Sequence, residues 1–246
     1  MTYRVLLLSC LLATSLYAQT AEEIIARAED IIRGKTSQGT FEMTVVTPEF
    51  TRTMVMDSWW VGTEKSLIVI KSPKKEAGNK WLKIGNEMWN YLKATETTIK
   101  IPPSMMLQSW NGSDFTNDDL ARESSYKVDY TATIVGEEEI NGEPCWKIRL
   151  DPKPEAAVVW GKIYGWVRKK DYIFSVVQFF DEKGRLIRYI VYSGIKTMGG
   201  RKLPTIWTIY NKVKKGHRTI FKILDIKFNI RIPDRIFSFR ELERGD

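Results

Sequence analysis

The chain has 246 residues, of which 43% are hydrophobic and 28% charged, and its formal net charge is +8. This length and apolar content suffice for one large domain with its own core. One histidine and two cysteines exclude a clustered zinc site, and the sequence has no phosphate loop, dinucleotide fingerprint or nucleic-acid-binding motif. We therefore expect no metal, no cofactor and no nucleic-acid partner.

The first residues have the pattern of a secretory signal peptide. Arg4 precedes a short apolar run at residues 5–16, which is shorter than the roughly 20 residues that a bilayer span needs. Ala18 stands where a signal peptidase would cleave. This pattern predicts a signal peptide at residues 1–18 and a single periplasmic domain at residues 19–246. A lipoprotein signal that ends at Cys10 is the alternative.

Removal of the signal peptide would leave Cys145 as the remaining cysteine, so no internal disulfide is expected. An exported protein without disulfides is typical of a bacterial envelope. The positive net charge could favour anionic lipid head groups or acidic partners. The charged residues are scattered along the sequence, however, and this is also typical of an ordinary soluble surface.

The predicted elements are one helix followed by many strands. Apolar residues recur at helical spacing over residues 21–33, with acids at the start and Arg33 before a glycine at the end. Alternating apolar residues then predict strands at 41–45, 50–61, 66–71, 80–84, 87–92, 97–101, 126–135, 144–150, 162–168, 172–180, 185–195, 205–213 and 218–228. Short turn-like joins indicate an antiparallel meander of roughly eleven to thirteen strands.

Two of these strands, at residues 172–180 and 185–195, are apolar on both faces. In the first, Tyr172, Phe174, Val176 and Phe180 alternate with Ile173, Val177 and Phe179. A sheet that is apolar on both faces must be covered on both or must enclose something. A curled sheet under a flap would form an apolar cavity suited to an acyl chain. Two packed layers with a dry core are the alternative.

Residues 101–120 (IPPSMMLQSWNGSDFTNDDL) interrupt the strand pattern. Two prolines end the preceding strand, residues 111–114 predict a turn, and Thr116 is a plausible N-cap. We interpret this segment as a flap of one or two short helices over the sheet. The alternative is a plug whose apolar side chains fill the core. The predicted lining of the cavity or lid consists of Trp59, Met88, Tyr91, Met105, Met106, Leu107, Trp110 and Phe115.

Catalytic residues are not evident. No GxSxG elbow accompanies a serine, and His217 lies in a predicted turn. Asp114 with Asp118 or Asp119 is the nearest approach to a carboxylate pair for hydrolysis. We predict that the protein is not an enzyme, with a hydrolase built on the acidic flap as the alternative.

Several motifs together resemble a known family. They are residues 108–120 (QSWNGSDFTNDDL), 142–146 (GEPCW) and 232–237 (IPDRIF), which follow an amphipathic first helix. The chain resembles the LolA/LolB-like superfamily over nearly all of its predicted mature length, and within it the outer-membrane lipoprotein-sorting protein branch. This resemblance implies a mainly β fold: a half-closed antiparallel β-barrel of about eleven strands, with an N-terminal helix and a short helical lid.

The resemblance also implies a function. It suggests a periplasmic carrier that binds acyl chains of lipids or lipoproteins and passes them between envelope membranes, with transient membrane contact. An inner-membrane transporter of the resistance-nodulation-division type is a possible partner, and an envelope adaptor or sensor for a transporter or regulatory protein is the alternative. In the lipoprotein carrier an arginine on an early strand latches the lid. No arginine stands near residues 59–62 here, and Arg52 lies too far upstream to match.

Overall fold

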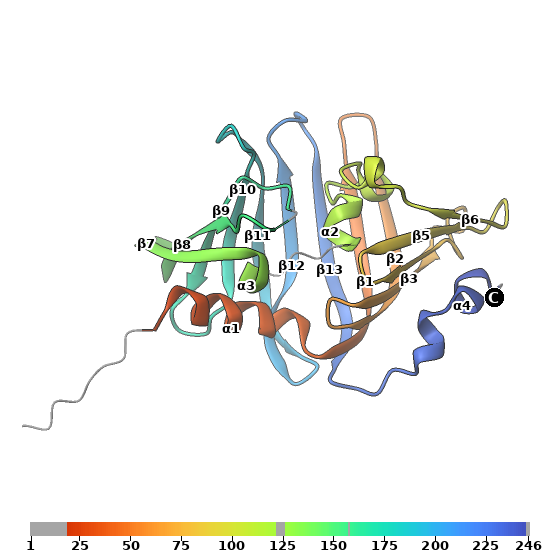
Figure 1. Ribbon diagram of the computed structural model, residues 1–246, viewed down its shortest axis with the longest axis horizontal. Helices are drawn as coiled ribbons and strands as arrows, with labels where there is room; N and C mark the ends of the chain where they lie inside the picture. Colours follow the sequence, from red (N-terminus) through yellow and green to blue (C-terminus); the bar gives the residue numbers. More distant parts are fainter. Residues whose placement is uncertain (1–18, 122–125, 157, 245–246) are drawn as a thin grey trace, which may run out of the picture.

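The computed structural model describes residues 19–121, 126–156 and 158–244 (Figure 1). The predicted signal peptide at residues 1–18 lies outside the described residues. Within them, the protein is one curved antiparallel sheet with short helices on both of its faces.

The sheet contains 13 strands in the order β6-β5-β4-β3-β2-β1-β13-β12-β11-β10-β9-β8-β7. Their bounds are β1 Thr36–Val46, β2 Thr51–Val61, β3 Lys65–Ser72, β4 Lys80–Ile84, β5 Glu87–Leu92, β6 Thr97–Lys100, β7 Tyr130–Ile140, β8 Glu143–Pro152, β9 Lys162–Arg168, β10 Phe174–Phe180, β11 Leu186–Met198, β12 Arg201–Asn211 and β13 Arg218–Phe228. The chain reaches one edge at β6 and resumes at the opposite edge with β7. The segment between these two strands, which includes the flap at residues 101–120, therefore connects the two edges.

Short helices accompany the sheet. Their bounds are α1 Ala21–Arg33, η1 Pro103–Met105, η2 Trp110–Gly112, α2 Asn117–Ala121, α3 Tyr126–Asp129, η3 Asp234–Phe237 and α4 Phe239–Glu243. Helix α1 begins with a capping box, in which the Glu23 amide donates to the Thr20 hydroxyl at 3.2 Å and the Glu23 carboxylate accepts from the Thr20 amide at 3.3 Å. Figure 1 shows α1, α2 and α3 on the same side of the sheet.

Strand β1 shows how the sequence creates the curvature. Its side chains alternate strictly between buried and half-buried along the strand, and its register against β13 shifts between Thr40 and Phe41. Such a bulge increases the local bend and twist. Gly39 is required at this point, because a Cβ there would lie 2.4 Å from the Asp225 carbonyl oxygen.

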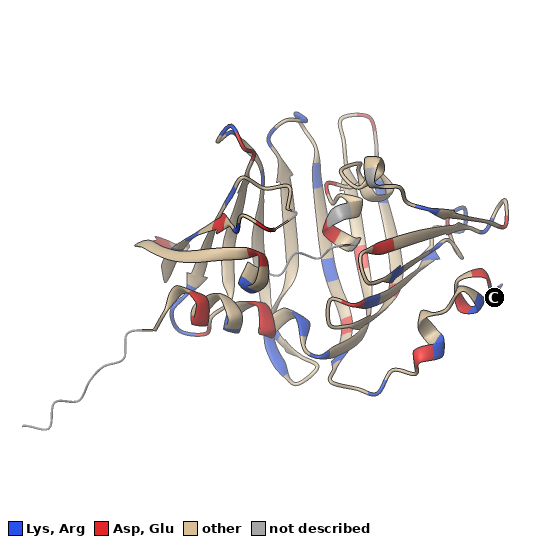
Figure 2. Cartoon of the chain, viewed as in Figure 1, with Lys and Arg blue, Asp and Glu red and all other residues tan. Residues whose placement is uncertain are grey.

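The apolar side chains form clusters on both faces. One cluster packs α1 against strands β7–β12, and a second joins strands β1–β5, β12 and β13 to the flap. Both contribute to the concave face. A third cluster covers the outer face of β3–β5, where Phe237 and Leu242 of the C-terminal segment pack on Leu67, Leu82 and Tyr91. Acidic and basic residues are both spread over the surface and do not gather in one patch (Figure 2).

The structure confirms the mainly β class, the half-open barrel and the helix at residues 21–33, with 13 strands where the family resemblance implies about eleven. Two local predictions are wrong. Residues 126–129 form helix α3 instead of the start of a strand, and β7 continues to Ile140, beyond the end of the predicted strand at residue 135. In β10 a register shift between Phe174 and Val176 brings Phe174 into the same cluster as Val177 and Phe179, whereas simple alternation predicts opposite faces.

The docking of α1 gives a first test. Ile25 is fully buried in the cluster under α1, and its replacement by alanine leaves a cavity that the sheet cannot collapse to fill. We expect Ile25→Ala to lower the free energy of unfolding by about 2–5 kcal/mol in urea titrations. The exposed Glu22→Gln on the same helix should cost about 1 kcal/mol or less. Equal effects would show that α1 is not docked as described.

Candidate functional site: an apolar cavity on the concave face

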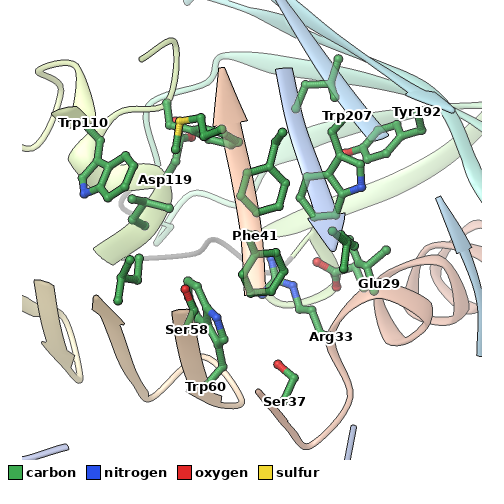
Figure 3. Close-up of a pocket in the computed structure, with 18 of the residues that line it drawn as sticks. Glu29, Arg33, Ser37, Phe41, Ser58, Trp60, Trp110, Asp119, Tyr192 and Trp207 are labelled. Carbon is green, nitrogen blue, oxygen red and sulfur yellow. The ribbon is translucent and has the colours of Figure 1, made fainter. Parts of the chain in front are cut away.

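A cavity of about 200 Å³ lies on the concave face between the two inner clusters (Figure 3). On this measure one water needs about 10–15 Å³, so the space corresponds to roughly a dozen or more methylene-sized groups. Its apolar lining comes from β1–β3, β10–β13, α1, α3, the loop between β8 and β9, and the flap. It consists of Ile32, Phe41, Met43, Met56, Trp60, Ile68, Trp110, Phe115, Leu120, Tyr126, Val158, Val159, Trp160, Phe179, Ile190, Tyr192, Trp207, Phe221, Ile223 and Ile226.

Aromatic rings form a continuous wall across the central strands. The ring of Phe221 lies 5.2 Å from Phe41, 5.3 Å from Trp207 and 6.1 Å from Phe115, measured between centroids. Tyr192 extends the wall at 5.5 Å from Trp207. Offset and tilted ring pairs at these distances are favourable contacts. They hold rigid, apolar surface around the space and so preserve its shape.

A network of hydrogen bonds around Asp114 attaches the flap to the sheet. The Asp114 amide donates to the Thr219 hydroxyl at 2.8 Å, and this hydroxyl lies 2.9 Å from the Asp114 carboxylate. The Asn211 side-chain amide donates to the same carboxylate at 3.0 Å. Asp114 and Thr219 are both buried, so these bonds fix the flap over β12 and β13.

A second tie is a buried ion pair between the flap and β11. The Arg188 guanidinium donates to both carboxylate oxygens of Asp119, each at 2.6 Å, and to the Asp114 carbonyl at 2.9 Å. Its central carbon lies 4.6 Å from the ring centroids of both Trp160 and Phe179. Asp119 also forms a reciprocal cap with Thr116: the Asp119 amide donates to the Thr116 hydroxyl at 3.1 Å, and the Thr116 amide donates to the Asp119 carboxylate at 2.7 Å. The predicted N-cap at Thr116 is therefore present.

The environment of this pair sets its charge state. Burial alone would raise the pKa of the Asp119 carboxyl, but the charge and hydrogen bonds of Arg188, together with the Thr116 amide, outweigh burial and hold that pKa below its usual value. Burial likewise opposes the charged form of Arg188, yet Asp119 keeps the Arg188 pKa above its ordinary value. Both groups are therefore ionised at neutral pH.

The start of the flap is anchored on the other half of the sheet. Arg52 of β2 donates to the Asn111 carbonyl and pairs with Glu76 at 3.1 Å. The Trp110 ring, 1% exposed, packs 5.0 Å from Trp81. From the sequence, we find no arginine that matches the lid-latching arginine of the lipoprotein carrier, and Arg52 lies too far upstream to match. The structure corrects this point, because Arg52 does reach the flap and Arg188, on a late strand, binds its helix α2.

The end of the cavity at α1 is polar. Glu29, Arg33, Ser37 and Ser58 contribute to the lining there, and Figure 3 shows Ser37, Ser58 and Arg33 grouped near Trp60. The Glu29 carboxylate, on a residue only 2% exposed, accepts from the Tyr126 amide at 2.8 Å and from the Lys127 amide at 3.3 Å. The Glu29 carboxylate, on α1, therefore caps the N-terminus of α3 and has a structural role.

The structure brings together only part of the predicted lining set. Trp110 and Phe115 line the cavity. Met88 and Met106 are buried in the inner cluster of β1–β5 without reaching the space, so part of the flap acts as a plug. Trp59 and Tyr91 pack on the outer face under the C-terminal segment, and Met105 and Leu107 are exposed on the flap. The adjacent Trp60 lines the cavity in place of Trp59.

Sequence reasoning missed Arg188, although the strand pattern contains a signal for it. Arg188 stands between Leu186 and Ile190 on one apolar face of a strand that is apolar on both faces. A charge in such a position must find a buried partner. The acidic residues of the flap, already noted as helix-capping groups, supply that partner.

Among the described residues, the acidic and thiol side chains that could take part in catalysis are either bound by other side chains or buried. Asp114 and Asp119 are bound by the partners described above, and among the described residues no three metal-ligating side chains cluster. The thiol of Cys145 is buried beside Ser175 at 3.5 Å, and burial raises its pKa. In the part of the chain that is described, no helix has the length and apolar character needed to cross a membrane.

Comparison with known proteins supports the fold. A family model described as an uncharacterized protein family matches residues 62–244. No curated protein matches the sequence. Similar solved structures include a DUF1329 family protein from Desulfovibrio piger, at 21% identity and a TM-score of 0.82 over 90% of this chain and 97% of that one.

Two further structures carry names related to lipoprotein sorting. A LolA superfamily protein from Nitrosomonas europaea is 22% identical with a TM-score of 0.78, covering 92% of this chain and 100% of that one. A candidate outer membrane lipoprotein-sorting protein domain from Vibrio parahaemolyticus is 21% identical with a TM-score of 0.79, covering 91% and 98%. At these identities the likeness establishes the fold.

The ion pair of the flap can be tested by removing its cation. Arg188→Met leaves the Asp119 carboxylate buried without its main partner, and we expect the free energy of unfolding to fall by about 3–5 kcal/mol. Arg185→Met, which removes a largely exposed partner of Asp181, should cost about 1 kcal/mol or less. A loss for Arg188→Met no larger than for this control would contradict a buried latch.

The same pair predicts a pH dependence. Because the folded-state pKa of Asp119 is lowered, its contribution to stability is complete above the unfolded-state pKa of about 3.9 and is lost as pH falls through the lower folded value. The stability difference between the wild type and Asp119→Asn should therefore be constant from neutral pH to about pH 5 and shrink below about pH 4. Denaturant titrations at several pH values measure it. A difference that already shrinks near pH 6 would refute the assignment.

Proposed function

This chain belongs to the uncharacterized protein family whose model it matches and has the fold of the LolA superfamily, and on that premise we propose that it is a carrier for the acyl chains of lipids or lipoproteins. The observation that carries the proposal is the apolar cavity between the two inner clusters, closed at one end by a tied flap. In this proposal the carrier works in the periplasm and passes its cargo between envelope membranes.

The lining suits a flexible apolar chain. The walls are aromatic and aliphatic side chains, with Met43 and Met56 among them, and methionine adapts its shape to irregular ligands. An acyl chain that buries about ten methylenes would gain roughly 8 kcal/mol from leaving water. Before the costs of association this corresponds to roughly a micromolar dissociation constant, which suits a ligand that must be released again.

The contacts that hold the flap would allow an acyl chain to enter and leave the cavity reversibly. The flap connects opposite edges of the sheet and is held by Arg52 on one half and by Arg188 on the other. Loss of one tie would leave the flap attached through the other, so the cavity could widen without unfolding of the sheet. The pattern of a signal peptide and the name of the Vibrio protein favour an envelope location and a lipid-linked cargo.

Filling the cavity provides the test. Ile223 lies on the inner face of β13 and lines the space, whereas its neighbour Leu224 is 48% exposed on the outer face. We expect Ile223→Trp to weaken binding of dodecanoate and of the apolar dye N-phenyl-1-naphthylamine by about tenfold or more, the equivalent of roughly two buried methylenes. Leu224→Trp on the same strand should leave both affinities unchanged.

Fluorescence titration of the dye measures these affinities, and native mass spectrometry of gently purified protein should show a retained lipid. Thermal unfolding of both variants checks that each is folded. Wild-type protein that binds neither ligand would sink the proposal, and so would equal weakening by the two tryptophans.

A further inference from the structure

Two serines interrupt the apolar concave face at the α1 end of the cavity. Ser37 of β1 and Ser58 of β2 are 6% and 2% exposed, and both line the cavity. In the register of β1 on β2, Ser58 is opposite Gly39 and Ser37 is opposite Trp60. The serines are therefore diagonal neighbours on the same face, and Figure 3 shows them at one end of the space.

No hydrogen bond joins either serine hydroxyl to another of the described residues, and neither oxygen is among the polar atoms that are completely buried without a partner. Both hydroxyls are therefore accessible from the cavity that the two serines line. Polar groups of buried residues are nearly always hydrogen-bonded to protein or to ordered water, so a pair of cavity-facing serines without a protein partner needs an explanation. Packing does not provide one, because a valine or alanine would suit an apolar sheet face without the cost of an unpaired hydroxyl.

The surroundings select the kind of partner. A serine hydroxyl is a hydrogen-bond donor that can rotate toward an acceptor, and the Arg33 guanidinium lines the same end of the cavity. The nearby Glu29 carboxylate already accepts from the Tyr126 and Lys127 amides. With the charges of Arg33 and Glu29 both at this end, the serine hydroxyls are rotatable donors that suit an oxygen acceptor.

We propose that Ser37 and Ser58 bind the oxygen-bearing head of the ligand, either the carboxylate of a free fatty acid or the ester carbonyl of a lipid. This inference rests on the proposed function, because it assigns an orientation to the acyl chain in the same cavity. The head lies at the α1 end, and the hydrocarbon tail runs toward Trp110, Phe115 and Leu120 of the flap.

The test compares ligands that share a tail but differ in the head. Wild type, the two single variants Ser37→Ala and Ser58→Ala, and the double variant are titrated calorimetrically with dodecanoate and methyl dodecanoate, and by fluorescence with N-phenyl-1-naphthylamine, which has no oxygen. The matched control is Ser66→Ala. Ser66 is 2% exposed on the adjacent strand β3 but does not line the cavity.

We expect the double variant to bind dodecanoate about 10- to 100-fold more weakly and the methyl ester about two- to tenfold more weakly, as for hydrogen bonds to charged and neutral acceptors. Affinity for the dye and the melting temperature should not fall. A larger loss for the carboxylate identifies a free acid as the preferred ligand, and equal losses identify the ester carbonyl. Ser66→Ala should change none of these values. If the double variant does not fold, the single variants give the same comparison.

The outcomes separate this inference from the proposed function. If wild type binds the dye and dodecanoate, and the serine variants bind dodecanoate as tightly as wild type does, the head-group site is wrong and the carrier proposal stands. If wild type binds neither ligand, both fail together. A fall in dye affinity equal to the fall for dodecanoate would also overturn the inference, because the serines would then only maintain the shape of the cavity.

Discussion

The buried guanidinium of Arg188 imposes a constraint on the whole concave face. It lies 4% exposed among aromatic rings, where an unpaired charge would carry a large desolvation penalty. Its partner, Asp119, belongs to a segment that leaves the sheet at one edge and rejoins it at the other. Satisfying the arginine therefore fixes the position of the flap across the sheet, and the position of the flap gives the cavity its closed end.

The cavity has an energetic consequence. Side chains that border a cavity contact fewer protein atoms than side chains of a filled core do, and the rings around Phe221 form part of this border. A chain selected for stability alone would fill this volume. A ligand that enters the cavity recovers those contacts and stabilises the folded state in proportion to its occupancy. Cavity and cargo are thus expected to be thermodynamically linked.

Sequence patterns were sufficient to predict the helices and strands, but not to predict which face of the sheet each strand residue occupies. The helix at residues 21–33 and strands such as residues 80–84 and 162–168 coincide with those observed, because their periodicity and turns are clear. The residue types could not show whether Trp59 or Trp60 lines the cavity, because a shift of one residue exchanges the two faces of a strand. Both faces of β2 bury apolar residues, so either tryptophan satisfied the pattern.

The flap was harder to predict for a different reason. Its role depends on contacts with residues far away in sequence, such as Thr219 and Arg188, and no local propensity reports these. Met105 and Leu107 are as apolar as Met106 yet remain exposed, because the irregular turn at these residues follows neither helical nor strand periodicity. Arg188 was predictable in principle, as a charge on an apolar strand face that has to be compensated nearby.

The charge state of the latch limits how the cavity can open. Because the Asp119 pKa is lowered and the Arg188 pKa is raised, both remain charged across the neutral range, and mild acidification does not weaken their attraction. In the proposed carrier, opening would be driven by a group that competes for Arg188 or Asp119, or by a ligand whose burial outweighs the loss of the pair. A partner surface or an entering lipid can supply this free energy, and the latch then acts as a threshold against opening in their absence.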